Sequence, residues 1–81
     1  MKYFVYILKS KNHNKTYVGY TNNLERRLKE HNSGKSIFTS KFVPWKIIYK
    51  EEFDQEIEAR KKEKYYKSSA GRRKIKLLIS K

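Results

Sequence analysis

Apolar positions at the start of the chain alternate as they do in a β-strand. In residues 3–9, the odd positions from 3 to 7 and the even positions from 4 to 8 are all aliphatic or aromatic, and successive side chains of a strand point to opposite faces. Both faces are therefore largely apolar, which predicts a central strand covered on both sides. The polar residues 10–15 predict a turn, and the β-rich run 16–20 predicts a second strand paired with the first as a hairpin.

The next stretch predicts one helix, a loop and a third strand. Asn22 stands three residues before Glu25, which resembles a capping box that opens a helix. Ser33-Gly34 stops that helix after residue 32. Residues 35–43 predict an ordered basic loop, and the β-rich residues 45–50 predict the third strand.

Two more helices are expected in the last third of the chain. Asp54 is a suitable N-cap, and acids in the following turn complement the helix dipole, which favours a helix to about Lys67. Ser69 could cap a short final helix. The order is β-β-α-β-α-α, which predicts one α+β domain over residues 1–81, with a small three-stranded antiparallel sheet flanked by helices.

Charge is the strongest global feature of the sequence. The 81 residues include 21 Lys and Arg but only 8 acids, a formal net charge of +13. Polyanions relieve the self-repulsion of so basic a fold, and each neutralised phosphate releases counterions. Nucleic acid is therefore the predicted partner, ahead of an anionic membrane surface and ahead of charge that serves solubility alone.

Composition excludes several other classes of protein. The chain has no cysteine, so disulfides and Cys-type zinc sites are excluded. No run approaches the ~20 apolar residues of a membrane span, and the apolar N-terminus is too short for a signal peptide. We therefore expect a cytoplasmic protein with no membrane partner. A domain this small has a thin core, which favours a shallow groove over an enclosed pocket.

Polar residues interrupt the apolar stripes of two predicted helices. Arg27 and His31 lie one turn apart on the stripe of the first helix. Glu63 is the one acid on the inward stripe of the second helix. That stripe also holds Ala59, Tyr66 and Ala70. Because a buried carboxylate is costly unless it is paired or bound to a cation, Glu63 is a candidate metal ligand.

The predicted hairpin adds two tyrosines and a glycine to these residues. Tyr6 and Tyr17 come from adjacent strands, and Gly19 permits close approach of a backbone or a ligand. Together the groups could cleave a phosphodiester, since they offer a base, a cation for developing charge and a carboxylate suited to Mg²⁺. Tyrosine is a poor base at its ordinary pKa of about 10, and we expect the surrounding positive charge to lower that pKa.

Each of these residues also has a purely structural interpretation. Tyr6 and Tyr17 could be ordinary strand aromatics, and Arg27 could be a solvated helix residue. His31 could complement the helix dipole, and Glu63 could form a surface ion pair with the lysines around it. The joint arrangement, rather than any single residue, favours the functional interpretation.

The arrangement resembles a known family. Val5-Tyr6-Ile7 and Tyr17-Val18-Gly19, followed by the helix 22–34, resemble the GIY-YIG domain, with Val replacing the first Gly and the second Ile. The similarity covers nearly the whole chain and is closest to the small stand-alone YhbQ-like (UPF0213) group. It implies a metal-dependent DNA endonuclease with one Mg²⁺ or Mn²⁺ ion, low sequence specificity and a role in DNA repair or processing.

The resemblance also implies roles for particular residues. Tyr6 matches the general base, and Tyr17 matches the residue that assists it or orients the water. Arg27 matches the arginine that holds the scissile phosphate, His31 the residue lying against the base, and Glu63 the metal ligand.

Further basic residues are candidate phosphate contacts. Arg26 is the competing register for the phosphate-binding arginine, and Arg27 is preferred because its partner one turn later is a histidine. Lys67 lies one turn after the candidate metal ligand, and Lys35 and Lys41 belong to the basic loop.

The sequence also departs from the pattern of larger GIY-YIG nucleases. Those proteins often carry a further His after the first helix, where this chain has Thr39 and Ser40, and a late Asn, for which Ser68 and Ser69 are the nearest candidates. A catalytically weak or inactive basic module that binds DNA or RNA is therefore the alternative function. We expect a monomer or a weak homodimer.

Overall fold

The computed structural model describes residues 1–79, which form three β-strands and four helices. The strands are β1 (Tyr3–Ser10), β2 (Thr16–Thr21) and β3 (Trp45–Phe53), and the helices are α1 (Leu24–Asn32), the single turn α2 (Ile37–Ser40), α3 (Glu56–Lys67) and α4 (Ser69–Ile79). The sheet is antiparallel with the order β2-β1-β3. The predicted α+β fold and element order are confirmed, with α2 as an addition. No helix within the described range is long and apolar enough to cross a bilayer.

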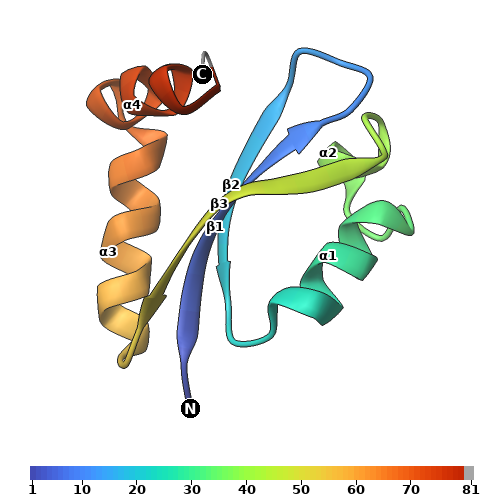
Figure 1. Ribbon diagram of the computed structural model, residues 1–81. Helices are drawn as coiled ribbons and strands as arrows, with labels where there is room; N and C mark the ends of the chain where they lie inside the picture. Colours follow the sequence, from blue (N-terminus) through green and yellow to red (C-terminus); the bar gives the residue numbers. More distant parts are fainter. Residues whose placement is uncertain (80–81) are drawn as a thin grey trace.

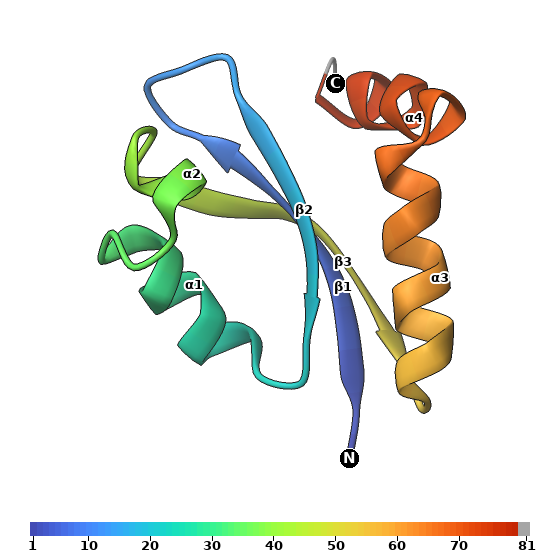
Figure 2. The same ribbon diagram turned by 180° about the vertical axis from the view of Figure 1, so that it is seen from behind.

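The sheet separates two helical layers (Figures 1 and 2). Helices α3 and α4 lie on one side of it, and α1 and α2 lie on the other. In the central strand, Val5 and Ile7 belong to the core beneath α3 and α4, whereas Tyr6 and Leu8 pack with Trp45 on the α1 side. All four β1 side chains are buried, as the two apolar faces of this strand predict.

The start of α1 differs from the prediction by one residue. Asn23, rather than Asn22, is the N-cap, and its Oδ1 accepts the Arg26 N–H at 3.1 Å. The Asn23 N–H donates to Thr21 Oγ1 at 3.1 Å. The predicted capping box is therefore wrong, because the last residue of β2 holds Asn23 in the capping position.

The start of α3 also departs from the prediction. Strand β3 continues to Phe53, beyond residue 50, and the N-cap of α3 is Gln55, which makes no side-chain cap bond. Asp54 does not cap the helix and instead pairs with Lys2 next to the start of β1. A tertiary ion pair has therefore replaced the local bond that the sequence predicts.

A close corner joins α3 to α4. The Oγ of Ser68, rather than that of Ser69, accepts the Gly71 N–H at 3.3 Å. Because α3 ends before Ala70, that residue is exposed and does not continue the inward stripe of α3. A Cβ on Gly71 would lie 2.0 Å from the Tyr65 carbonyl oxygen. Glycine at this position therefore lets α4 turn tightly against α3.

The predicted loop at residues 35–43 contains the helical turn α2. Its backbone is tied to the sheet, because Trp45 Nε1 donates to the Thr39 carbonyl oxygen at 2.8 Å. Asn32 at the end of α1 accepts the Trp45 backbone N–H at 2.6 Å. These long-range bonds fix the segment against the sheet and bury the Thr39 side chain.

Candidate active site

Four elements bring the candidate residues together around the edge strand β2. Tyr6 of β1 lies opposite Gly19 of β2 in the strand register. The ring of Tyr17 packs on the same side of the sheet, with its centroid 6.4 Å from that of Tyr6. Helix α1 supplies His31, whose ring centroid is 4.8 Å from that of Tyr17. Glu63 comes from α3, and its charge acts on the Tyr6 phenol.

Gly19 provides the space in which the Tyr6 phenol lies. A Cβ at this position would be 2.5 Å from Tyr6 Oη and 3.1 Å from Cε2 of Tyr17. Both distances are too short for ordinary packing, so any side chain here would push Tyr6 out of place. The sequence predicted that the missing side chain of Gly19 would allow close approach of a backbone or a ligand. In the structure it allows close approach of the Tyr6 phenol instead.

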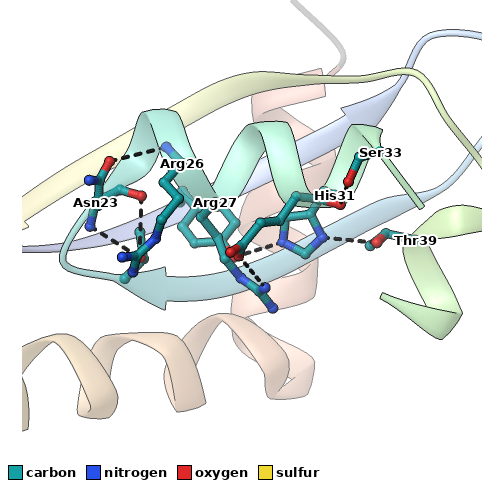
Figure 3. Close-up of polar contacts among 9 residues, drawn as sticks. Asn23, Arg26, Arg27, His31, Ser33 and Thr39 are labelled. Carbon is teal, nitrogen blue, oxygen red and sulfur yellow. Dashed lines mark hydrogen bonds and ion pairs between the residues drawn. The ribbon is translucent and has the colours of Figure 1, made fainter. Parts of the chain in front are cut away.

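A buried chain of hydrogen bonds runs from α2 through α1 to β1. His31 Nε2 lies 3.0 Å from Tyr6 Oη, and His31 Nδ1 lies 2.9 Å from Thr39 Oγ1. Figure 3 shows the His31 ring reaching toward Thr39. All three side chains are at most 2% exposed. A neutral imidazole has one donor and one acceptor, so the bond at one ring nitrogen determines the direction of the bond at the other.

His31 is neutral at physiological pH. Burial and, as a smaller cause, the nearby charge of Arg27 lower the pKa of its imidazole to about 4. The ring makes both of its hydrogen bonds inside the protein. A histidine that complements the helix dipole would be charged, so this neutral ring does not act in that way.

Tyr6 does not have the lowered pKa that the sequence predicted. The pKa of this phenol is raised to about 12, mainly by burial; the Arg27 guanidinium opposes the increase, and Tyr17 and the charge of Glu63 add to it. Loss of hydration therefore outweighs the nearby positive charge. At pH 7 the phenolate form of Tyr6 is present in only about 1 part in 10⁵.

Arg27 faces the site, whereas Arg26 is exposed. Arg27 is half-buried, and its Nη1 donates to Glu30 Oε1 at 3.0 Å. This bond holds the pKa of the Glu30 carboxyl below its usual range. Figure 3 shows Arg26 and Arg27 on successive positions of α1. The structure thus favours Arg27 as the arginine near the tyrosines, since its charge acts on both Tyr6 and His31.

Glu63 and Lys67 close the site from the side of α3. The Glu63 side chain is 19% exposed, and its Oε2 lies 3.3 Å from Lys67 Nζ. Lys67 Nζ also lies 6.0 Å from the centroid of the Tyr17 ring. The ion pair expected from the surrounding lysines is therefore present, but it lies beside the tyrosine pair.

The comparison with known proteins agrees with this geometry. A family model described as the GIY-YIG catalytic domain matches residues 2–76. The chain belongs to the GIY-YIG family.

Individual relatives place the protein within a group of that family. It is 42% identical to a UPF0213 protein of Clostridium perfringens over 79 residues, which cover 96% of this chain and 84% of the relative. It is 37% identical to a UPF0213 protein of Staphylococcus haemolyticus, with 95% and 94% of the two chains covered. The solution NMR structure of a UPF0213 protein from Bacillus halodurans has a TM-score of 0.58 and 34% identity, over all of this chain and 86% of the other. The predicted family and group are both confirmed.

The donor atoms of this GIY-YIG domain suit a hard divalent cation. Within residues 1–79, no three or more His, Cys, Asp or Glu side chains gather into a metal cage. Mg²⁺ does not need such a cage, because it binds through one or two carboxylates together with water and phosphate oxygens. Glu63 offers one partly exposed carboxylate beside the tyrosines, which fits this mode of binding.

Two of the predicted phosphate contacts flank the helical turn α2. Lys35 and Lys41 are exposed on either side of α2. Lys35 lies near the end of α1, since its charge helps to lower the pKa of Glu30. Neither lysine forms an ion pair within the described part of the chain.

Sequence reasoning missed two polar partners in the GIY-YIG site. Glu30, which pairs with Arg27, has a detectable signal because acids and bases three residues apart on a helix are neighbours. The role of Thr39 has no local signal, because its contact with His31 depends on how α2 folds back onto α1.

Proposed function

We propose that this GIY-YIG domain is a metal-dependent DNA endonuclease that hydrolyses phosphodiester bonds with low sequence specificity, in DNA repair or processing. The observation that carries the proposal is the convergence of Tyr6, Tyr17, Arg27 and Glu63 around the edge of β2. These groups supply a proton acceptor, a cation and a metal ligand, which phosphodiester hydrolysis requires.

Tyr6 accepts the proton of the attacking water as part of a relay. A free phenolate is too rare at pH 7 to serve alone, because the Tyr6 pKa is about 12. Tyr6 Oη therefore takes the water proton while its own proton moves to Nε2 of His31, 3.0 Å away. In this direction His31 Nδ1–H donates to Thr39 Oγ1. A phosphate bound at Arg27 opposes the charge that lowers the His31 pKa, which makes the imidazole a better acceptor.

Arg27 binds the scissile phosphate and stabilises the negative charge that develops on it. Its planar guanidinium carries five donors, so it can keep its bond to Glu30 and still offer N–H groups to phosphate oxygens. Tyr17, whose ring lies beside both Tyr6 and His31, orients the attacking water. Positioned donors of this kind contribute most where charge appears in the transition state.

Glu63 is the residue that would hold the Mg²⁺ or Mn²⁺ ion. When bound, the ion supplies Lewis-acid stabilisation of the leaving 3′-oxygen. Lys67 Nζ lies 3.3 Å from the Glu63 carboxylate and would contact a phosphate next to the scissile one.

A binding module without catalysis is the second candidate function. Two observations favour it: the pKa of Tyr6 is raised rather than lowered, and within residues 1–79 no three or more His, Cys, Asp or Glu side chains gather around a metal position. Such a module would use the same basic surface for DNA or RNA without cutting either.

Replacement of the candidate metal ligand separates these two functions. We expect the wild type to cut labelled duplex and branched DNA with Mg²⁺ or Mn²⁺ and to stop in EDTA. Glu63→Gln should lose cleavage yet retain binding, because the fold and all of the positive charge remain. Glu58→Gln is the matched control, since Glu58 is an exposed acid of the same helix, and it should cut like the wild type.

Two results would contradict the nuclease. Cleavage that persists in Glu63→Gln or in EDTA would exclude the proposed metal ligand. DNA binding by the wild type without cleavage under any metal condition would identify the domain as the binding module.

A further inference from the structure

A groove of about 690 Å³ opens next to the candidate active site. It lies along the edge of β2, between the hairpin turn, α2 and α4. Tyr17 and Lys67 line it and also belong to the tyrosine site, so the two spaces adjoin. The proposed hydrolysis uses no other residue of this groove.

The walls of the groove are basic and its floor is apolar. Lys15 from the hairpin turn and Arg72 from α4 are exposed side chains of the wall, and none of the lining residues is acidic. Val18 and Ile75 are buried beneath them. A ligand that suits these basic walls and this apolar floor is a polyanion that also has an apolar surface.

An exposed aromatic ring stands at the side of the groove nearest α2. Phe38 is 46% exposed, although its ring packs 6.2 Å from that of Tyr17, measured between centroids. Exposed aromatic rings beside basic side chains are typical of sites that bind single-stranded nucleic acid, where bases stack on the ring and phosphates meet the cations.

The groove favours an unpaired strand over a duplex. Its volume is in the range that encloses one small molecule, which corresponds to about one or two nucleotides. Bases inside a duplex are stacked on each other and cannot lie on Phe38. The bases of a single strand are free to do so.

We infer that the groove binds an unpaired DNA strand that continues from the scissile phosphate, so that the substrate is a junction between duplex and single strand. Lys15 and Arg72 contact phosphates of that strand, and Phe38 stacks on one of its bases. Tyr17 and Lys67 connect the bound strand to the site of hydrolysis. The inference rests on the proposed function, because it names the class of substrate for the same site.

Binding to matched DNA tests the groove without any need for cleavage. Fluorescence anisotropy in EDTA at one fixed salt concentration would compare a blunt duplex with the same duplex carrying a single-stranded tail. We expect the wild type to bind the tailed DNA about tenfold more tightly, since stacking of one base is worth roughly this much. Phe38→Ala should reduce the affinity for tailed DNA to that for the blunt duplex.

Charge and control variants sharpen this test. Arg72→Gln should weaken binding of the tailed DNA several-fold and lower its salt dependence by about one phosphate contact. Ile57→Ala and Arg60→Gln remove an exposed apolar and an exposed basic side chain of α3 outside the groove. Both controls should keep the preference for the tail.

The outcomes distinguish a failure of the groove from a failure of the nuclease. Equal affinity of the wild type for blunt and tailed DNA, or equal losses in groove and control variants, would overturn the inference even if the domain cuts DNA. A preference for the tail that Phe38→Ala and Arg72→Gln abolish would support the groove even if no cleavage is found.

Discussion

Tyr6 and Tyr66 are both buried, with 2% and 1% exposure, but they lie on opposite faces of the sheet. The hydroxyl of Tyr6 is part of a hydrogen-bonded chain with His31 and Thr39. The hydroxyl of Tyr66 has no hydrogen-bond partner among residues 1–79. Tyr66 is surrounded by an apolar core. That core contains Val5, Ile7, Val18, Ala59 and Ile75.

The difference teaches that burial alone does not identify a functional tyrosine. A buried hydroxyl without a partner costs about 1–3 kcal/mol, so Tyr66 contributes through the area of its ring. Tyr6 keeps its hydroxyl satisfied and placed against Gly19 at the edge of the sheet. The core beneath α3 therefore stabilises the fold, whereas the candidate site combines polar groups from the α1 side with Glu63 and Lys67 of α3 at the edge of β2.

Truncation on the apolar face should have the largest effect on stability. Ile7 is fully buried beneath α3 and α4, so Ile7→Ala should lower the free energy of unfolding by about 2–5 kcal/mol. Urea unfolding would measure the change. Because Ile57 is 59% exposed, Ile57→Ala should change stability little. A loss of DNA cleavage by Ile7→Ala at a temperature where it remains folded would argue against the separation of the two faces.

Buried His31 on the α1 side of the sheet should make the stability of the protein depend on pH. The pKa of His31 is about 4 in the folded protein, against an ordinary value of 6.5. Between these two pH values the unfolded chain binds a proton at His31, whereas the folded chain does not. The free energy of unfolding should therefore fall as pH falls from about 6.5 to 4, by about 3 kcal/mol in total.

Urea unfolding at pH 7 and pH 5 would measure this dependence in two histidine variants. His31→Gln should lose this contribution, whereas His13→Gln should retain it because His13 is exposed. Identical pH profiles for the wild type and His31→Gln would show that burial of this ring does not control the effect.

A smaller effect is expected at the outer end of the hydrogen-bonded chain. Thr39→Val keeps the shape of the side chain but leaves His31 Nδ1 without its partner, which should cost about 1–3 kcal/mol of stability. Cleavage should fall about tenfold and its pH profile should shift, since the tautomer of His31 is no longer fixed. Thr39→Ser restores the hydroxyl and should recover both properties. An unshifted pH profile in Thr39→Val would limit Thr39 to a structural role.

Much of the fold follows from the sequence because its signals are periodic. The two apolar faces of residues 3–9 required a central strand, and β1 is central. The helix caps and the turn α2 were not predictable, since contacts distant in sequence determine them. Asp54 forms an ion pair with Lys2 instead of capping α3, and Trp45 donates a hydrogen bond to the backbone of α2.

The residues that make up the candidate site could be predicted from the sequence, but the pKa of Tyr6 could not. Hairpin pairing and helical spacing place Tyr6, Tyr17 and Arg27 near one another. The raised pKa of Tyr6 depends on how completely the layers of the fold exclude water from its phenol. The hydrogen bond between Thr39 and His31 was likewise not predictable, because the two residues belong to different helices.

Paired removal of the two buried hydroxyls tests the central claim most directly. Tyr6→Phe and Tyr66→Phe would be compared with the wild type in single-turnover cleavage of DNA with saturating Mg²⁺, and DNA binding would be measured alongside. We predict that Tyr6→Phe cuts about 10²–10⁴-fold more slowly with unchanged binding, whereas Tyr66→Phe cuts at the wild-type rate and is equally or more stable. Equal cleavage rates in the two variants would contradict the assignment of proton transfer to Tyr6.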